Sequence, residues 1–189
     1  AAVPKVCPHF HLSLQSGCDE TLKRMNRHYT TEEYYDKVKL LRRVFKNPAV
    51  TTDVITGFPG ETEEEFAVTR RFLEKVDFFE MHVFKYSKRA GTRAAVMEDQ
   101  VNDQEKARRS AVLIAMNEEH KNAFENRQIG TRRTVLIEEK LRNSSGNFYV
   151  GHTKEYVKVA VESEEPLENQ IVEVELTGIT GEGYVAGNV

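Results

Sequence analysis

The sequence predicts a two-part protein: an α/β half with a parallel sheet, joined by a helix to a small antiparallel β-barrel that is OB-like or of a related shape. Three observations support this prediction. Strand and helix patterns alternate up to about Arg127, and five short β-rich runs then follow within about 60 residues. The charge balance also changes, because residues 128–189 contain ten glutamates against six basic residues, whereas the preceding part is nearly neutral.

The first half predicts strands and helices in alternation. Alternating or β-branched runs indicate strands over residues 7–15, 51–56 and 79–86. Helices are expected from Asp19, as the N-cap, to Met25, after Tyr29, after Thr62, and from about Asp103 to Arg127. The segments Thr30-x-x-Glu33 and Thr62-x-x-Glu65 match capping boxes. Strands and helices in this order indicate βαβ units.

The second half predicts only strands. They cover residues 133–139, 147–151, 156–162, 170–177 and 183–188. Turn residues separate them, namely Asn143-Ser144-Ser145-Gly146, Pro166 and Gly181-Glu182-Gly183. Five strands of this length suit a small closed sheet.

The composition excludes several classes of protein. The chain has 189 residues, a formal net charge of −3, 39% hydrophobic residues and a mean hydropathy of −0.56, which is a globular balance. No apolar run reaches the ~18 residues of a membrane span, and the first ten residues lack the apolar core of a secretory signal. With two cysteines, Cys7 and Cys18, no disulfide framework is expected. We therefore expect a cytoplasmic protein that acts without a membrane.

The predicted strands sort into an apolar and a polar face. Side chains alternate across a strand, so His11, Ser13 and Gln15 share one side, as do Asp53 with Ile55 and His82 with Phe84. A parallel strand buried on both faces is normally apolar throughout. The polar faces therefore predict a ligand pocket, open at the C-terminal strand ends.

Two short motifs leave alternatives open. Cys7-x-His9-x-His11 could seat Zn²⁺, but no fourth ligand is near in sequence, and a hydrogen-bonded polar lining is the preferred interpretation, so no metal site is predicted. The turn Gly57-Phe58-Pro59-Gly60 lies where a strand meets a helix, a position that can bind phosphate. Glu61, expected in the first turn of that helix, would repel an anion while complementing the helix dipole, and a plain tight turn is the alternative interpretation.

Basic residues interleaved with aromatic residues indicate nucleic acid, although such runs are also common on solvated faces. In the first half they surround Tyr86. In the barrel they accompany Phe148, Tyr149 and Tyr156. The candidate RNA-binding residues are Lys85, Lys88, Arg89, Arg132, Arg133, Lys154 and Lys158.

Three longer strings resemble a known family. HLSLQSGCDETLKRMNRHYT (residues 11–30), TTDVITGFPGETEEEF (51–66) and HVFKYSKRAGTRAA (82–95) are similar to the radical-SAM methylthiotransferases, and residues 128–189 look like their C-terminal TRAM domain. The strings resemble the threonylcarbamoyladenosine tRNA enzymes more than the isopentenyladenosine or ribosomal-protein enzymes. The resemblance implies that residues 1–127 form the C-terminal portion of an incomplete, TIM-like radical-SAM barrel, followed by the TRAM barrel.

The resemblance also implies a reaction, cofactors and a partner. Such enzymes add a 2-methylthio group to a modified adenosine beside the tRNA anticodon, using S-adenosylmethionine (SAM) and two [4Fe–4S] clusters, with a sulfur donor that the sequence does not identify. The C-x-x-x-C-x-x-C cluster motif of the family is not in this chain. The resemblance therefore implies a C-terminal fragment that binds no cluster, supplies no catalytic residue and is inactive alone.

The family pattern assigns the SAM pocket residue by residue. Arg27 corresponds to an arginine near the SAM carboxylate, although a helix-end arginine that binds carbonyl groups is an alternative role. Phe84 and Tyr86 correspond to the strand end beside adenine. The complete candidate set is Gln15, Ser16, Arg27, Asp53, Ile55, Gly57, Phe84 and Tyr86.

Two other functions are compatible with the sequence. One is a non-catalytic RNA-binding module, in which the α/β part positions the barrel. The other is an acid–base enzyme that uses His9, His11 and Asp53, which would require turnover by this chain alone.

Overall fold

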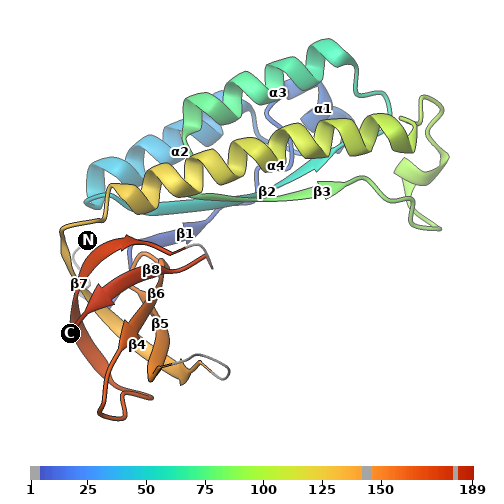
Figure 1. The fold of residues 1–189 in the computed structure, drawn as a ribbon. Helices are drawn as coiled ribbons and strands as arrows, with labels where there is room; N and C mark the ends of the chain where they lie inside the picture. The colour runs from blue at the N-terminus through green and yellow to red at the C-terminus, as the bar shows by residue number, and fades with distance from the viewer. Residues whose placement is uncertain (1–4, 142–145, 181–182) are drawn as a thin grey trace. The chain divides into compact units, whose positions relative to one another are not determined.

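A three-stranded parallel sheet, with helices packed on one face, forms the first part of the fold (Figure 1). The structure is a computed structural model that describes residues 5–141, 146–180 and 183–189. It divides into two compact units, Phe10–Lys121 and Asn122–Val189, the second including the described residues up to His9. The predicted turn residues Asn143, Ser144, Ser145, Gly181 and Glu182 lie outside the described residues.

The sheet has the order β1-β2-β3, and α2, α3 and α4 cover one of its faces (Figure 1). The β2–β3 pair is parallel, with Asp53 opposite His82 and Ile55 opposite Phe84. The elements of this part are β1 (His9–His11), α1 (Asp19–Arg24), α2 (Thr31–Val44), β2 (Ala49–Thr56), α3 (Glu63–Val76), β3 (Glu80–Lys85), the 3₁₀ helix η1 (Arg93–Val96) and α4 (Asp103–Asn126). The predicted alternation of strands and helices is confirmed.

Both predicted capping boxes are present. The Thr30 hydroxyl accepts the Glu33 N–H while the Glu33 carboxylate accepts the Thr30 N–H, and Thr62 and Glu65 form the same pair at the start of α3. The prediction of Asp19 as an N-cap is wrong, because Cys18 holds that position. The Asp19 carboxylate instead accepts the Thr31 N–H at 2.7 Å, which ties α1 to the start of α2.

The predicted strand over residues 7–15 is shorter than expected. β1 ends at His11, and the ladder resumes only at Gln15, which bridges Val54. Between them, the Thr52 hydroxyl accepts the Leu14 N–H at 2.9 Å and donates to the Leu12 carbonyl at 2.6 Å. A side chain thus replaces the backbone pairing at this point, which is why the regular strand stops.

The apolar core lies between the sheet and the helices, as the predicted strand faces require. Its members come from α2, β2, α3, β3, α4 and two connecting segments and are at most 8% exposed: Leu14, Tyr34, Val38, Val50, Val54, Phe66, Leu73, Val76, Phe78, Met81, Leu113 and Met116. Burial of these side chains is the main stabilising contribution in this unit. The polar strand faces are thereby left on the other side of the sheet.

The second unit contains a closed barrel with the strand order β4-β5-β6-β8-β7. Its strands are β4 (Arg132–Lys140), β5 (Phe148–Thr153), β6 (Lys158–Glu162), β7 (Ile171–Ile179) and β8 (Val185–Asn188). The predicted five-stranded barrel is confirmed, but the expectation of a wholly antiparallel sheet is wrong, because β6 and β8 pair in parallel. Among the described residues, no helix is both long and apolar enough to cross a membrane.

Candidate functional site: a pocket at the strand ends

A cavity of about 700 Å³ lies at the C-terminal ends of β2 and β3. This volume is within the range of small-molecule sites. Its lining comes from three strand ends and the segments that follow them: Gln15, Arg27, Asp53, Ile55, Phe58, Phe84, Lys85, Tyr86, Ser87, Arg89, Thr92 and Ala94. Six of the eight residues assigned to a SAM pocket from sequence are in this lining.

The apolar part of the lining can accommodate a flat ring. Ile55 and Phe84 are register partners on adjacent strands, so their side chains share a face. Phe84 is 52% exposed despite its size, and Phe58 packs edge-on against Tyr86 with ring centroids 5.3 Å apart. Exposed aromatic surface in a concave site is a common means of binding a heterocycle.

The polar part of the pocket lining contains both a guanidinium and a carboxylate, those of Arg27 and Asp53. The Arg27 guanidinium is exposed and, in the described part of the chain, it pairs with no carboxylate and donates to no carbonyl. Its backbone N–H bonds the Leu22 carbonyl at 2.9 Å, so the main chain, rather than the side chain, completes the end of α1. Asp53 accepts the Ser13 hydroxyl at 2.9 Å on the same side of the sheet. An anion and a hydroxyl group could therefore bind at different points of one pocket.

Gln15 marks the edge of the pocket with an unusual backbone. Its φ of 70° lies in the left-handed region, which is uncommon for a residue with a side chain, and its side chain is buried. The Gln15 N–H bonds the Asp53 carbonyl at 2.8 Å, and its own carbonyl accepts the Ile55 N–H at 2.8 Å. Gln15 therefore fixes the backbone of Asp53 and Ile55, the two residues of β2 that line the pocket.

A buried ion pair supports the loop after β2. Glu61 accepts the Gly57 N–H at 2.7 Å and pairs with Arg109 at 2.7 Å, and both side chains are at most 5% exposed. Burial raises the pKa of Glu61, while the hydrogen bonds from Arg109 and Gly57 act against that rise. The expectation that Glu61 lies in the first turn of a helix is wrong, since α3 begins at Glu63. The Gly57 N–H is thus already bonded and is not free to bind a phosphate.

Two residues assigned to the pocket lie behind its wall instead. Ser16 is fully buried and its hydroxyl accepts the Cys18 N–H at 3.2 Å. Gly57 is also absent from the lining, and it packs against the Lys106 side chain. Sequence position next to a strand end identified both residues, but only the fold determines whether such a residue faces the cavity or the core.

Several lining residues were not identified from the sequence. Phe58 belongs to the turn that was considered for ligand contact, and its aromatic side chain was the available signal. Thr92 and Ala94 follow β3, where no periodic pattern marks the 3₁₀ turn of η1, whereas Ser87 was expected at the end of the third strand. The small side chains of Thr92 and Ala94 gave no signal in the sequence.

The candidate RNA-binding residues are divided between the units. Lys85 and Arg89 line the pocket, and Lys88 is exposed beside them. In the barrel, Arg132 and Lys154 are exposed, Lys158 lies 4.6 Å from the centre of the Tyr184 ring, and Tyr156 is 54% exposed. Arg133 is held by the buried Gln128, to whose oxygen it donates at 2.6 and 3.0 Å. Arg133 therefore has a structural role in the barrel.

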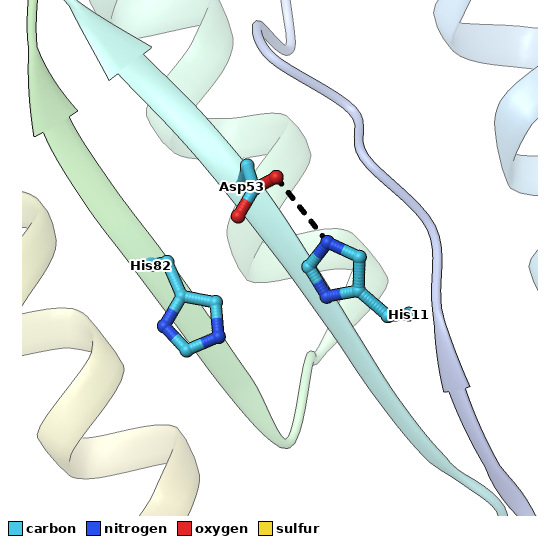
Figure 2. Close-up of side chains that lie close together, drawn as sticks. All are labelled: His11, Asp53 and His82. Atoms are coloured by element: carbon cyan, nitrogen blue, oxygen red, sulfur yellow. Dashed lines mark hydrogen bonds and ion pairs between the residues drawn. The ribbon is translucent and has the colours of Figure 1, made fainter.

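The residues present do not fit an iron–sulfur cluster. The chain contains only Cys7, which is exposed, and Cys18, which is buried, and their spacing is not that of a cluster motif. The residues considered for Zn²⁺, Cys7, His9 and His11, are also not the set that the structure assembles: in the described residues, the ligand-type side chains that come together are His11, Asp53 and His82 (Figure 2).

Comparison with known proteins identifies relatives along most of the chain. Residues 2–73 match the family described as the Radical SAM superfamily. The threonylcarbamoyladenosine tRNA methylthiotransferase MtaB of Bacillus subtilis (strain 168) is 40% identical, over 91% of this chain and 38% of the relative. The tRNA-2-methylthio-N(6)-dimethylallyladenosine synthase of Campylobacter jejuni (strain RM1221) is 41% identical, over 92% of this chain and 40% of the relative.

A solved structure has a similar fold. The coproporphyrinogen III oxidase HemN of Escherichia coli, a radical SAM enzyme, aligns with a TM-score of 0.51 over 78% of this chain and 41% of its own, at 15% identity. This likeness concerns the fold alone. The chain spans about two fifths of the length of the curated relatives it matches. Residues 2–73 thus resemble the Radical SAM superfamily, and more than nine tenths of the chain is similar to tRNA methylthiotransferases.

Proposed function

We propose that the protein containing this chain is a SAM-dependent tRNA methylthiotransferase that adds a 2-methylthio group to N6-threonylcarbamoyladenosine next to the anticodon. The observation that carries the proposal is the pocket at the strand ends. It brings together Gln15, Arg27, Asp53, Ile55, Phe84 and Tyr86, which the family pattern assigns to SAM. This chain contributes binding and orientation to the reaction.

The volume of the pocket, its aromatic rings and its charged groups support SAM as the ligand. Its adenine would contact Phe84 and Tyr86, its ribose would lie along Asp53 and Ile55, and its carboxylate would pair with the exposed Arg27 guanidinium. When bound, SAM supplies the radical chemistry of the reaction. The cysteines of this chain do not form a cluster site, so we assign no electron-transfer step to its residues.

The choice of nucleoside rests on the three sequence strings. A relative named for threonylcarbamoyladenosine and one named for dimethylallyladenosine are almost equally identical to this chain, at 40% and 41%. Overall identity therefore supports the methylthiotransferase reaction but does not distinguish the two nucleosides. The choice of threonylcarbamoyladenosine rests on the three sequence strings alone.

The barrel is proposed to be a TRAM domain of OB-like topology that binds tRNA. Its closed order β4-β5-β6-β8-β7, with one parallel pair, supports this assignment. Tyr156 is 54% exposed, but its ring already stacks on His152 and His9, with centroids 4.3 and 5.0 Å apart, so the support from this surface is the exposed cations Arg132 and Lys154, which suit phosphates. A non-catalytic RNA-binding module, the second candidate, is supported by the same barrel surface.

The SAM pocket can be tested by calorimetric titration of this chain with SAM. We expect one site, and because a charge-assisted hydrogen bond contributes about 1.5–3 kcal/mol, Arg27→Ala should weaken binding roughly tenfold or more. Phe84→Ala should weaken it as well, through loss of apolar contact. Lys39→Ala, on the exposed surface of α2, is the matched control and should bind as the unmodified chain does. Saturable binding that neither pocket variant alters would place SAM elsewhere.

A further inference from the structure

The polar face of the sheet brings two imidazoles and one carboxylate together. His11, Asp53 and His82 come from β1, β2 and β3 in turn, and their side chains point toward a common region (Figure 2). Asp53 and His82 are register partners in parallel strands, so their side chains leave the same face side by side. One ligand-type atom from each residue lies within 4.8 Å of the others.

We propose that His11, Asp53 and His82 bind a divalent transition-metal ion of the Zn²⁺ type. Two histidine nitrogens and one carboxylate oxygen are a ligand set that Zn²⁺ uses where further positions stay open to water or substrate. Tetrahedral ligands about 2.0 Å from Zn²⁺ lie roughly 3.3 Å apart. His11 Nε2 and Asp53 Oδ2 are already 3.2 Å apart, so a small side-chain rotation of His82 completes the set.

Neighbouring hydroxyl groups hold two of the ligands in the required orientation. His11 Nδ1 lies 3.0 Å from the Thr51 hydroxyl, and Nε2 lies 3.2 Å from both Asp53 Oδ2 and the Ser13 hydroxyl. The Ser13 hydroxyl donates to Asp53 Oδ2 at 2.9 Å. Histidine ligands of metals typically bond an acceptor through their second nitrogen, and carboxylate ligands are hydrogen-bonded in turn. The cluster therefore has its supporting contacts as well as its ligands.

The third member of the cluster is free to move into place. In the part of the chain that the structure describes, the His82 imidazole forms no hydrogen bond, and its ring lies 5.9 Å from that of His11 by centroid distance. His11 and His82 are exposed, so an ion can reach all three side chains.

The site is distinct from the SAM assignment except for Asp53, which also lines the pocket. The ion would lie on the strand face toward the N-terminal side of the pocket, since His82 precedes Phe84 on β3 and His11 ends β1, before Gln15. The proposal does not depend on SAM binding, and it is tested with the metal alone.

The experiment is titration of the chelator-treated chain with Zn²⁺, followed by calorimetry, and with Co²⁺, followed by visible absorption. We expect one ion per chain and the visible bands of Co²⁺ bound to nitrogen and oxygen ligands. Changes to groups that merely orient a ligand cost roughly 10–100-fold in affinity. We therefore expect His11→Gln and His82→Gln each to weaken Zn²⁺ binding by about 100-fold, and Ser13→Ala by about tenfold.

His28→Gln is the matched control, because His28 is an exposed histidine of the same unit outside the cluster, and it should leave binding unchanged. His82→Cys provides a positive test, since a thiolate ligand gives Co²⁺ a sulfur-to-metal charge-transfer band in the near ultraviolet. Circular dichroism checks that each variant is folded. Absence of stoichiometric Zn²⁺ binding, or equal affinity in folded His11→Gln, His82→Gln and His28→Gln chains together with no such band, would overturn the proposal.

Discussion

Gly57 links β2 to the loop behind the pocket, and its position admits no side chain. Its φ is +69°, and a Cβ there would collide with Cγ of Lys106. Lys106 is buried, with its Nζ 3.2 Å from Asp103 and 5.6 Å from the centre of the Tyr86 ring, so it cannot simply turn away. The glycine thus lets α4 pack closely against the loop that supports the pocket wall.

Gly57→Ala is therefore expected to lower the free energy of unfolding by about 2–5 kcal/mol. The left-handed backbone accounts for roughly 1–2 kcal/mol, and the collision with Lys106 adds an overpacking cost of about 1–3 kcal/mol. Gly91→Ala is the control, because its φ is +80° but a Cβ there meets nothing within 4 Å. Chemical denaturation of both variants measures the difference. Equal losses would show that the packing against Lys106 contributes nothing.

At the scale of elements, Thr52 shows how one side chain determines the length of a strand. Its hydroxyl bridges the Leu12 carbonyl and the Leu14 N–H, and Tyr34 donates to the same carbonyl at 2.7 Å. The sequence predicted a longer strand because the alternation of residues 7–15 is regular, and a side chain inserted from another strand leaves no local signal. The same alternation correctly placed Leu14 in the core and His11 on the polar face.

Thr52→Val should destabilise the first unit by about 1–3 kcal/mol, because it keeps the shape of the side chain but leaves the buried Leu14 N–H without its partner. Thr56→Val is the matched control, since Thr56 is equally buried on the same strand and its hydroxyl makes only one long bond, 3.4 Å to the Phe84 carbonyl. Thermal or chemical unfolding compares the two. A larger loss for Thr56→Val would contradict the role given to Thr52.

The helix starts were predictable because capping boxes are local: Thr30 and Thr62 bond residues three positions away. Asp19 was mistaken for a cap because aspartate favours that position, whereas its carboxylate bonds Thr31, twelve residues along the chain. Local patterns therefore predicted where α2 and α3 begin. The role of Asp19 was not predictable in this way, because it depends on a contact between two helices.

An arginine pair on α4 makes part of the stability dependent on pH. Hydrogen bonds from Arg108 and Arg109, at 2.9 and 2.8 Å, lower the pKa of Glu105 from 4.5 to about 2. A carboxyl group whose pKa is lowered in the folded chain contributes stability above its unfolded pKa and loses it as the pH falls through the folded value. This contribution should therefore be complete above about pH 4.5 and be lost toward pH 2.

Glu105→Gln is expected to flatten the fall in unfolding free energy between these pH values, since the glutamine does not titrate. Glu118→Gln, an exposed glutamate on the same helix with no ion pair among the described residues, should leave that slope unchanged. Urea unfolding at a series of pH values provides the comparison. An unchanged slope for Glu105→Gln would mean that Glu105 is not bound to the arginines in solution.

At the scale of the whole molecule, the sequence predicted two parts and most of the pocket. Asp53 and Phe84 lie on β2 and β3, and Gln15 follows β1 and bridges Val54, so their grouping at one edge of a parallel sheet follows from topology. The parallel pairing of β6 and β8 was not predictable, because β7 separates them in sequence and no local pattern specifies the partner. The His11–Asp53–His82 cluster was missed because the alternation of residues predicts the face of each strand but not the register that places Asp53 opposite His82.

The most direct test of the central claim is mass spectrometry of tRNA nucleosides from a strain that lacks the gene encoding this chain. The account predicts loss of the 2-methylthio form of N6-threonylcarbamoyladenosine, accumulation of its unmodified precursor, and rescue by the intact gene but not by a gene carrying Arg27→Ala. Loss of the isopentenyladenosine counterpart instead would keep the reaction and change the nucleoside. Survival of every methylthio nucleoside would contradict a role in tRNA modification and favour an RNA-binding module or a protein substrate.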